Sequence, residues 1–256
     1  MNRILFEHGE IADGMATFGG ARAEHVVNVL HGDVGQVIKT GEIGGMNGTA
    51  EIVDIRRGDD GAPQIVARVS HAEVPLQPWI DLILAPPRPR VMKRLLPQLA
   101  SLGVGRIVLV GAEKVEKDFW GATLLKEENW RPLFVDGLMQ AGTGVMPILE
   151  TRRNFRRFLR DELDALFPSK NRIVAHPYAG DGCRECAEAP SGRLLLAVGP
   201  EGGWTDGEVA LLEDRGFRRY SLGPRILRTD TAVVALLARL MPLNSTADLM
   251  YNSHQS

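Results

Sequence analysis

The stretch LLLAVGPEGGWTDGEVALLEDRGFRRYSLGPRILRTDTAVVALLARL, residues 194–240, decides the fold of this chain. It opens with an uninterrupted apolar run, residues 194–198, which is typical of a strand buried on both faces of a parallel sheet. Gly199-Pro200-Glu201-Gly202-Gly203 then breaks the strand, and its glycines allow a ligand to approach the backbone closely. The sequence therefore predicts a buried strand that ends in a glycine turn.

The pattern of strand, turn and helix is repeated once. Thr205 to Glu208 fits a capping box and predicts a helix start, and Gly216 predicts the end of that helix. A second strand is expected over residues 217–222, followed by a second break at Gly223-Pro224-Arg225. Thr229 or Thr231 is expected to cap a last helix, which should be buried because residues 232–241 are apolar on nearly every side.

Two glycine turns at the carboxyl ends of strands favour a ligand crevice. Their spacing fits neither the dinucleotide fingerprint nor the phosphate-binding P-loop. The pattern alone therefore leaves two interpretations open, a ligand site of another kind or an ordinary α/β crossover with tight turns.

GPEGG and SLGPRILRTDTA stand in this order, about 20 residues apart. With these motifs the chain resembles the SPOUT methyltransferases. Within them it is most similar to the family that methylates N3 of a uridine in bacterial 16S ribosomal RNA. The resemblance implies an α/β fold in which a C-terminal SPOUT trefoil-knot domain with a parallel sheet follows a small N-terminal PUA-like β-barrel. It also implies S-adenosylmethionine as methyl donor and a homodimer.

Residues 1–74 are rich in strand and turn signals. Strands are expected over residues 3–6, 36–39, 49–55 and 64–70, and a helix over residues 22–31. By resemblance this is the PUA-like, RNA-binding domain, in which His25 begins an H-x-x-x-V-L segment typical of the family. The alternative for His25 is a structural histidine. The proline-containing stretch 73–78 is expected to be a linker.

Beyond the linker, strands alternate with helices, which indicates a parallel α/β sheet. We expect the methyltransferase domain to span residues 75–243 and a polar tail to span residues 244–256. Pro97 is expected to kink one helix and Arg131-Pro132 to break another. The expected strands are 79–85, 106–110, 146–150 and 172–176, and the expected helical segments are 91–102, 123–140 and 154–167.

Composition restricts the function classes. The chain has 256 residues, is 44% hydrophobic and 24% charged, and carries a net charge of −2. It lacks the run of ~20 apolar residues that a membrane span needs and a signal-peptide core near the N-terminus, so a cytoplasmic location is expected. The two cysteines form one C-R-E-C motif, Cys183 and Cys186. Reduced thiols are expected rather than a redox pair or half a zinc site, and no metal is expected.

RNA binding needs local basic clusters, because the chain as a whole is slightly acidic. One cluster lies where a strand ends and a helix begins, and by resemblance it faces RNA; its members are Arg88, Arg90, Lys93 and Arg94. A second cluster comprises Arg152, Arg153, Arg156, Arg157 and Arg160, and its interpretation as a solvated charged face is favoured. Arg225, in the second turn, is a further candidate for RNA contact.

The cofactor site is expected in the loops that follow three neighbouring strands. An apolar slot would hold the adenine ring, and backbone groups would meet its edge. The residues expected to bind the cofactor are His176, Gly199, Pro200, Gly202, Leu222, Gly223, Ile226 and Leu227.

Methylation at uridine N3 requires removal of the N3 proton and stabilisation of the charge that develops on the uracil oxygens. Arg228, with Arg225 as a second possibility, is the candidate for charge stabilisation; an ion pair of Arg228 with Glu201 or Asp230 is the structural alternative. Glu201 is the candidate proton acceptor, or else a cofactor ligand. Ser101 stands where the family commonly has glutamate, and Gln140-Ala141-Gly142-Thr143 stands where E-Q-S-G-R is common. Another RNA target, a ribose target, or a non-catalytic ribosome-assembly factor therefore remain alternatives.

Overall fold

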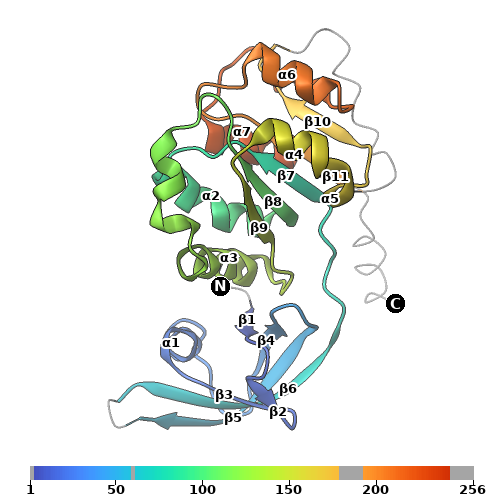
Figure 1. The fold of residues 1–256 in the computed structure, drawn as a ribbon. Helices are drawn as coiled ribbons and strands as arrows, with labels where there is room; N and C mark the ends of the chain where they lie inside the picture. Colours follow the sequence, from blue (N-terminus) through green and yellow to red (C-terminus); the bar gives the residue numbers. More distant parts are fainter. Residues whose placement is uncertain (1–2, 59–60, 179–192, 243–256) are drawn as a thin grey trace. The chain divides into compact units, whose positions relative to one another are not determined.

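The computed structural model describes residues 3–58, 61–178 and 193–242. The chain divides into two compact units that each combine separate stretches of sequence (Figure 1). The first contains the residues up to Pro78 together with Leu95–Gly105 and Thr123–Ile148. The second contains Trp79–Arg94, Arg106–Ala122 and the residues from Leu149 onward. Cys183, Cys186 and the tail 244–256 lie outside the described residues.

The first unit holds a six-stranded sheet with the order β1-β4-β5-β6-β3-β2. Strands β1 and β4 are parallel and the other pairs are antiparallel. All four strands expected in this region are confirmed, and helix α1 (Gly20–Asn28) ends before the predicted His31. The strands are β1 (Ile4–Phe6), β2 (Ile11–Ala12), β3 (Met15–Phe18), β4 (Val37–Glu42), β5 (Asn47–Arg57) and β6 (Pro63–Glu73).

The β2–β3 hairpin was not expected from the sequence. Ile11 pairs with Ala16 and Ala12 with Met15, which leaves a two-residue turn. Both turn residues have positive φ, 51° at Asp13 and 72° at Gly14. This is the conformation that an Asp-Gly turn between antiparallel strands requires. The dipeptide was therefore a usable signal for a hairpin.

Helix α3 (Glu127–Ala141) also belongs to the first unit. Arg131 makes two hydrogen bonds of 2.6 Å to the carboxylate of Glu7, next to β1. A Cβ at Gly137 would lie 2.1 Å from the carbonyl oxygen of Pro97, so only glycine permits this approach. The predicted break at Arg131-Pro132 is wrong, because α3 is continuous through Pro132. The carbonyl of Glu128, which loses its partner at Pro132, belongs to an exposed residue of the first turn and can bind water.

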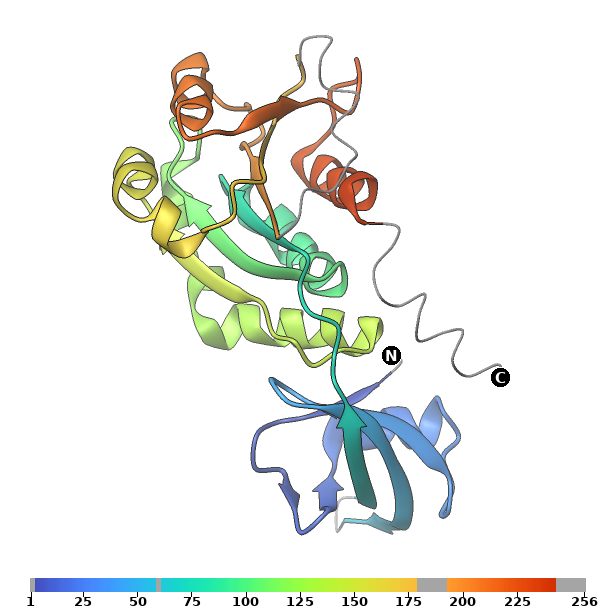
Figure 2. The same cartoon turned by 90° about the vertical axis from the view of Figure 1, so that its right-hand side faces the viewer.

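The second unit is built on a six-stranded sheet with the order β12-β10-β11-β7-β8-β9. The pairs β10–β11, β10–β12 and β11–β7 are parallel, as predicted for an α/β domain. Helices α4 and α6 lie on one face of this sheet and α7 on the other (Figures 1 and 2). The strands are β7 (Ile80–Leu84), β8 (Val104–Val110), β9 (Ile148–Arg152), β10 (Arg172–Ala175), β11 (Leu194–Val198) and β12 (Arg218–Tyr220).

The helical elements after β7 differ from expectation mainly at their ends. The predicted helix over residues 154–167 is divided in two at Glu162. Helix α2 continues through Pro97. The elements are α2 (Pro89–Ser101), the 3₁₀ helices η1 (Lys117–Gly121) and η2 (Thr123–Leu125), α4 (Phe155–Asp161), α5 (Leu163–Leu166), α6 (Asp206–Glu213) and α7 (Thr229–Leu240).

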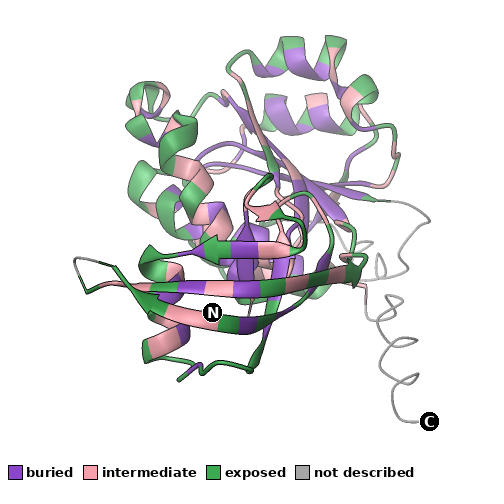
Figure 3. Cartoon of the chain, turned by 90° about the horizontal axis from the view of Figure 1, so that it is seen from below, coloured by how far each residue is buried: buried purple, intermediate pink, exposed green. Residues whose placement is uncertain are grey.

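Strands β7 and β11 lie side by side at the centre of the sheet. Every residue of both strands is buried, and the adjoining helices alternate buried and exposed faces (Figure 3). The uninterrupted apolar run of β11 is thereby explained, since a central strand has helices on both of its faces. Because β7 and β11 are buried on both faces, their ends are held in place, and so are the starts of the loops that follow them.

The capping box at the start of α6 is confirmed. The Thr205 side chain accepts the backbone N–H of Glu208, and the Glu208 carboxylate accepts the backbone N–H of Thr205 at 2.8 Å. Gly216 follows α6 with a φ of +82°, as a glycine stop requires.

The expected cap and burial of α7 are wrong. Its N-cap is Arg228, without a side-chain cap hydrogen bond, and Thr229 is already the first helical residue. Burial is confined to one side of the helix, at Thr229, Val233, Leu236 and Leu237. The apolar sequence of α7 therefore leaves part of its surface accessible within one chain.

Arg172 is the largest fully buried side chain of the described residues and lies at the start of β10. Its guanidinium donates hydrogen bonds to the backbone carbonyls of Phe167, Ser169 and Arg215, at 2.9 to 3.1 Å. It also donates to the Asp164 carboxylate at 2.6 Å. A buried charge is stable here because its donors are matched by acceptors.

The contribution of Asp164 to the free energy of unfolding should depend on pH. Hydrogen bonds from Lys170 and Arg172 lower the pKa of Asp164 from its ordinary 3.8 to about 2. Because the folded pKa is the lower one, the stabilisation is complete above about pH 4 and is lost as pH falls towards 2. We expect urea midpoints of the wild type and Asp164→Asn to differ most at pH 6 and to differ progressively less as the pH is lowered from about 4 towards 2. A difference that stays constant with pH would contradict this assignment.

No helix in the described part of the chain has the length and apolar character needed to span a membrane.

Candidate active site

A pocket of about 470 Å³ lies where the chain turns after β10, β11 and β12, and α7 forms part of its wall. The three strands are neighbours and parallel, so their carboxyl ends meet at one edge of the sheet. The two glycine turns recognised in the sequence therefore meet in space. All eight residues expected to bind the cofactor line this pocket: His176, Gly199, Pro200, Gly202, Leu222, Gly223, Ile226 and Leu227.

The first turn, residues 199–203, is tightly folded. The backbone N–H of Gly203 donates to the carbonyl of Pro200 at 2.8 Å, and Gly203 has a φ of +68°. A Cβ at Gly199 would lie 2.9 Å from the backbone nitrogen of Trp204. Trp204 is itself stacked on Phe155 of α4, with ring centroids 5.2 Å apart. A backbone hydrogen bond thus closes the turn, and the stacking of Trp204 on Phe155 supports the residue that follows it.

Two neighbouring loops brace this turn. The Glu201 carboxylate accepts the backbone N–H of Arg88 at 3.0 Å. Lys114 donates from Nζ to the carbonyl of Gly202 at 2.9 Å. Since Arg88 directly precedes helix α2, Glu201 places a negative charge at the N-terminus of that helix, where the helix dipole favours it. Glu201 lines the pocket and anchors the pocket turn at the same time.

The second loop is tied to the loop after β10. The Ser221 hydroxyl donates to the carbonyl of Pro177 at 2.9 Å, and the backbone N–H of Gly223 donates to the same hydroxyl oxygen at 3.1 Å. Gly223 has a φ of +110°, a conformation that side-chain-bearing residues rarely adopt. Arg225, further along this loop, lines the pocket.

Arg228 has a different environment from Arg225. It is exposed and stands between Leu227 and Thr229, both of which line the pocket, while its own side chain is not part of the lining. The ion pair to Asp230 considered from the sequence is absent, because Asp230 pairs with Arg94 at 2.9 Å. Within the described ranges, no carboxylate pairs with Arg228.

The first turns of α2 gather the basic cluster at residues 88–94. Arg88 donates to Glu116 at 2.8 Å and Arg94 pairs with Asp230. Arg90 and Lys93 are exposed on the same turns. His25 belongs to the other unit, where its Nε2 is buried and has no hydrogen-bond partner among the described residues. An RNA contact by His25 would therefore have to use another atom of the ring.

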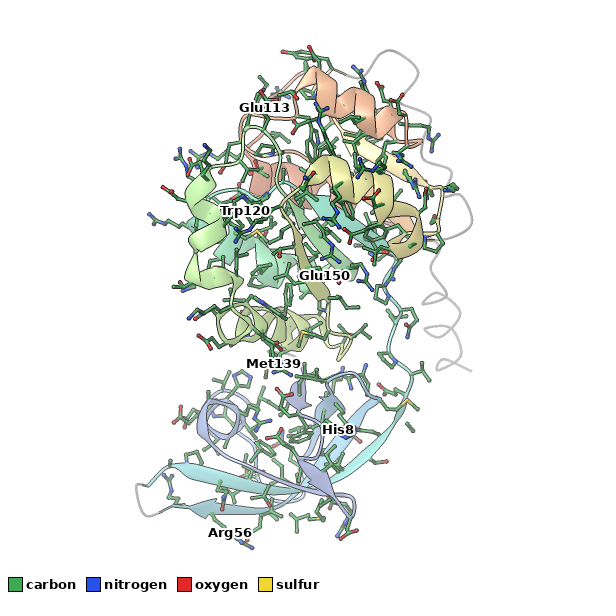
Figure 4. The ribbon with its side chains drawn as sticks, viewed as in Figure 1. His8, Arg56, Glu113, Trp120, Met139 and Glu150 are labelled. Atoms are coloured by element: carbon green, nitrogen blue, oxygen red, sulfur yellow. The ribbon has the colours of Figure 1, made fainter. Side chains whose placement is uncertain are left out.

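The second basic cluster is mostly neutralised. Arg152 pairs with Glu150 and Glu162, whereas Arg157 and Arg160 pair with Asp161. Arg153 lies over the ring of Trp120, 5.5 Å from its centroid. Figure 4 labels Glu150 on β9 and Trp120 in η1. These pairings agree with a solvated charged face.

The sequence matches the family model of the RNA methyltransferase domain over residues 74–241. This match covers more than half of the chain and includes every residue of the pocket. The chain belongs to this family.

Full-length relatives support the family. The ribosomal RNA small subunit methyltransferase E of Treponema pallidum is 30% identical over 241 residues, which are 93% of this chain and 90% of the relative. The crystal structure of an enzyme of the same name from Neisseria gonorrhoeae, bound to S-adenosyl methionine, is 25% identical, with a TM-score of 0.66. It covers 93% of this chain and 95% of its own. A Legionella pneumophila protein of known structure shares the fold, with a TM-score of 0.70 and 24% identity; the match covers 93% of this chain and 96% of that one.

Several pocket residues were missed by the sequence reasoning. Trp204 and Asp206 belong to the segment where the first turn leads into α6, and Thr229 and Leu236 belong to α7. Tyr178 follows His176-Pro177 at the end of β10. An aromatic residue directly after a loop already assigned to the cofactor was a signal for Tyr178. No sequence signal identified Lys114 as a brace, since its role depends on a contact 88 residues away.

Proposed function

We propose that this protein transfers a methyl group from S-adenosylmethionine to N3 of a uridine in the 16S ribosomal RNA of the small subunit. The observation that carries this proposal is the meeting of both glycine turns in one pocket of about 470 Å³, within the range of cofactor sites. Membership of the RNA methyltransferase family and the names of the full-length relatives support the substrate class.

The pocket suits a cofactor with a flat base and polar ends. Leu222, Ile226 and Leu227 offer an apolar wall, while Gly199 and Gly202 leave backbone groups approachable. Pro200, Gly223 and His176 complete the proposed binding set. The bound cofactor supplies an electrophilic methyl group, and the protein has to hold the target nitrogen in line with it.

Deprotonation and charge stabilisation fall to residues around the pocket. Holding the target nitrogen in line with the methyl group can by itself lower the barrier by about 7–11 kcal/mol in well-aligned reactions. Arg228, exposed beside the pocket and free of a carboxylate among the described residues, is proposed to stabilise negative charge on the uracil oxygens. Glu201 is proposed to accept the N3 proton or to bind the cofactor, while its bond to Arg88 fixes its position.

RNA binding is proposed for the start of α2, with Arg88, Arg90, Lys93 and Arg94, and for Arg225 at the pocket. Residues 1–74 are proposed to form a PUA-like RNA-binding domain that contributes His25, and residues 75–243 the methyltransferase domain. The folded ribosomal RNA would present its base turned out of the stack. A ribosomal substrate is consistent with a cytoplasmic location.

We further propose a trefoil knot and a homodimer. The knot is supported by β11, which lies between the earlier strands β7 and β10, and by α7, which closes the pocket from the end of the domain. The dimer is supported by α7, whose sequence is apolar although Met241, just after it, is 37% exposed and Ala238 is exposed. Sedimentation equilibrium of the purified protein tests the dimer.

The proposed reaction is tested on small ribosomal subunits that lack the modification. Incubation with the protein and labelled S-adenosylmethionine should place label in 3-methyluridine after digestion of the 16S RNA to nucleosides. Label in a ribose or in another base would show that the protein is a methyltransferase with a different target from uridine N3. No labelled nucleoside, with cofactor binding measured separately as intact, would refute the proposal.

A further inference from the structure

Two side chains at the pocket are unusually exposed for their type. Among the large hydrophobic residues in the described part of the chain, Ile226 is the most exposed, at 81%, and Tyr178 follows at 74%. Single exposed apolar residues are ordinary on protein surfaces. Here the two most exposed ones come from different loops and line the same pocket. Exposed apolar surface concentrated at a pocket indicates a region that a ligand covers.

Tyr178 is held in place by its own loop. Its backbone N–H donates to Nδ1 of His176 at 3.2 Å. The rings of His176 and Tyr178 meet edge to face, with centroids 6.1 Å apart and planes at 65°. The carbonyl of the intervening Pro177 accepts the Ser221 hydroxyl. The tyrosine ring is thus presented at the pocket by a hydrogen-bonded loop.

The loop that carries Ile226 leaves the sheet beside the loop of Tyr178. Strands β10 and β12 are parallel neighbours, with Ala175 opposite Tyr220, so both loops begin at the same level of the sheet. The bond from Ser221 to Pro177 keeps the two loops together. An aromatic face and a branched aliphatic side chain therefore belong to one rim of the pocket.

We propose that Tyr178 is a cofactor-binding residue whose ring stacks on the adenine base, with Ile226 contributing to the same apolar slot. The proposal rests on the use of S-adenosylmethionine proposed above. A flat aromatic ring matches a flat purine, and stacking of this kind contributes measurably to binding. His176, which lines the pocket itself, then also orients the loop that carries the ring.

The ring could instead lie over the positively charged sulfonium, by a cation–π contact. The two placements are separable with S-adenosylhomocysteine, which keeps the adenine but has a neutral thioether. We would titrate the wild type, Tyr178→Ala and Tyr178→Phe with both compounds by calorimetry. Leu76→Ala, which truncates a side chain that is 65% exposed in the other unit, is the control for surface truncation.

With adenine stacking, Tyr178→Ala should raise the Kd for both compounds by about 10-fold, to a similar extent. Tyr178→Phe keeps the ring and should stay within about twofold of the wild type, as should Leu76→Ala. Circular dichroism would check that Tyr178→Ala is folded.

A loss confined to S-adenosylmethionine would place the ring at the sulfonium and overturn the proposal. An unchanged Kd for both compounds would also overturn it. Failure of the wild type to bind either compound would refute the proposed function itself. The two failures can be told apart, because the proposed function fails when the wild type does not bind, whereas only the role of Tyr178 fails when the wild type and Tyr178→Ala bind equally well.

Discussion

Replacing Arg228 with alanine is expected to lower kcat for uridine methylation by about 100-fold or more, the usual effect of removing one donor to a developing oxyanion. The Kd for S-adenosylmethionine should stay within about twofold of the wild type. The reason is geometric, because Arg228 stands beside the pocket without lining it. A residue that serves the incoming base should be exposed in the free enzyme, as Arg228 is. Single-turnover methylation and calorimetry measure the two quantities.

Two further variants sharpen this test. Arg239→Ala removes an exposed arginine from the last turn of the same helix and should leave kcat unchanged. Arg225→Ala removes an arginine that does line the pocket, so its effect should include a weaker Kd for the cofactor or for RNA. If Arg228→Ala weakens cofactor binding and keeps kcat, the proposed role is wrong.

Replacing Arg172 with methionine is expected to lower the free energy of unfolding by about 3–5 kcal/mol. Methionine fills part of the space but leaves three backbone carbonyls without their donor, those of Phe167, Ser169 and Arg215. The Asp164 carboxylate is about half exposed and can turn to water, so it contributes less to the loss. Urea unfolding followed by circular dichroism measures the change.

Arg160→Ala is the matched control for Arg172. Arg160 pairs with Asp161 at the surface, where its side chain is 69% exposed. Surface pairs contribute little, so its urea midpoint should not move. Equal effects of the two substitutions would mean that the carbonyl network around Arg172 is not stabilising. Because β10 begins at Arg172 and ends at the loop of His176, a loosened Arg172 variant should also bind the cofactor less tightly.

The pocket was the part of the molecule most accessible from sequence. Glycine turns after strands have a strong local signature, and parallel neighbouring strands bring such turns to one edge. This is why all eight residues expected at the cofactor line one pocket. The braces of that pocket were not accessible. Glu201 meets Arg88 across 113 residues, and no local pattern predicts which backbone N–H a carboxylate will find.

The predictions of secondary structure and burial were wrong where tertiary context overrides local sequence preference. Pro132 does not break α3, because the carbonyl that it leaves unpaired belongs to exposed Glu128. The threonines expected to cap α7 do not cap it: Thr229 is drawn into the helix, where it is buried. The all-round apolar pattern of α7 predicted full burial, yet within one chain only one side is buried. A partner subunit, as proposed, would reconcile the pattern with the burial.

The closure of the pocket by α7 has a consequence for biosynthesis. The pocket lining extends from Ala175 to Leu236, so part of its wall is made by α7, which is translated after both glycine turns. A nascent chain that has emerged from the ribosome only as far as Leu227 has both glycine turns but lacks Thr229, Ala232 and Leu236. With the cofactor bound in this pocket, as proposed, its capture would have to follow translation of α7, and chains stalled before α7 should be inert as methyltransferases.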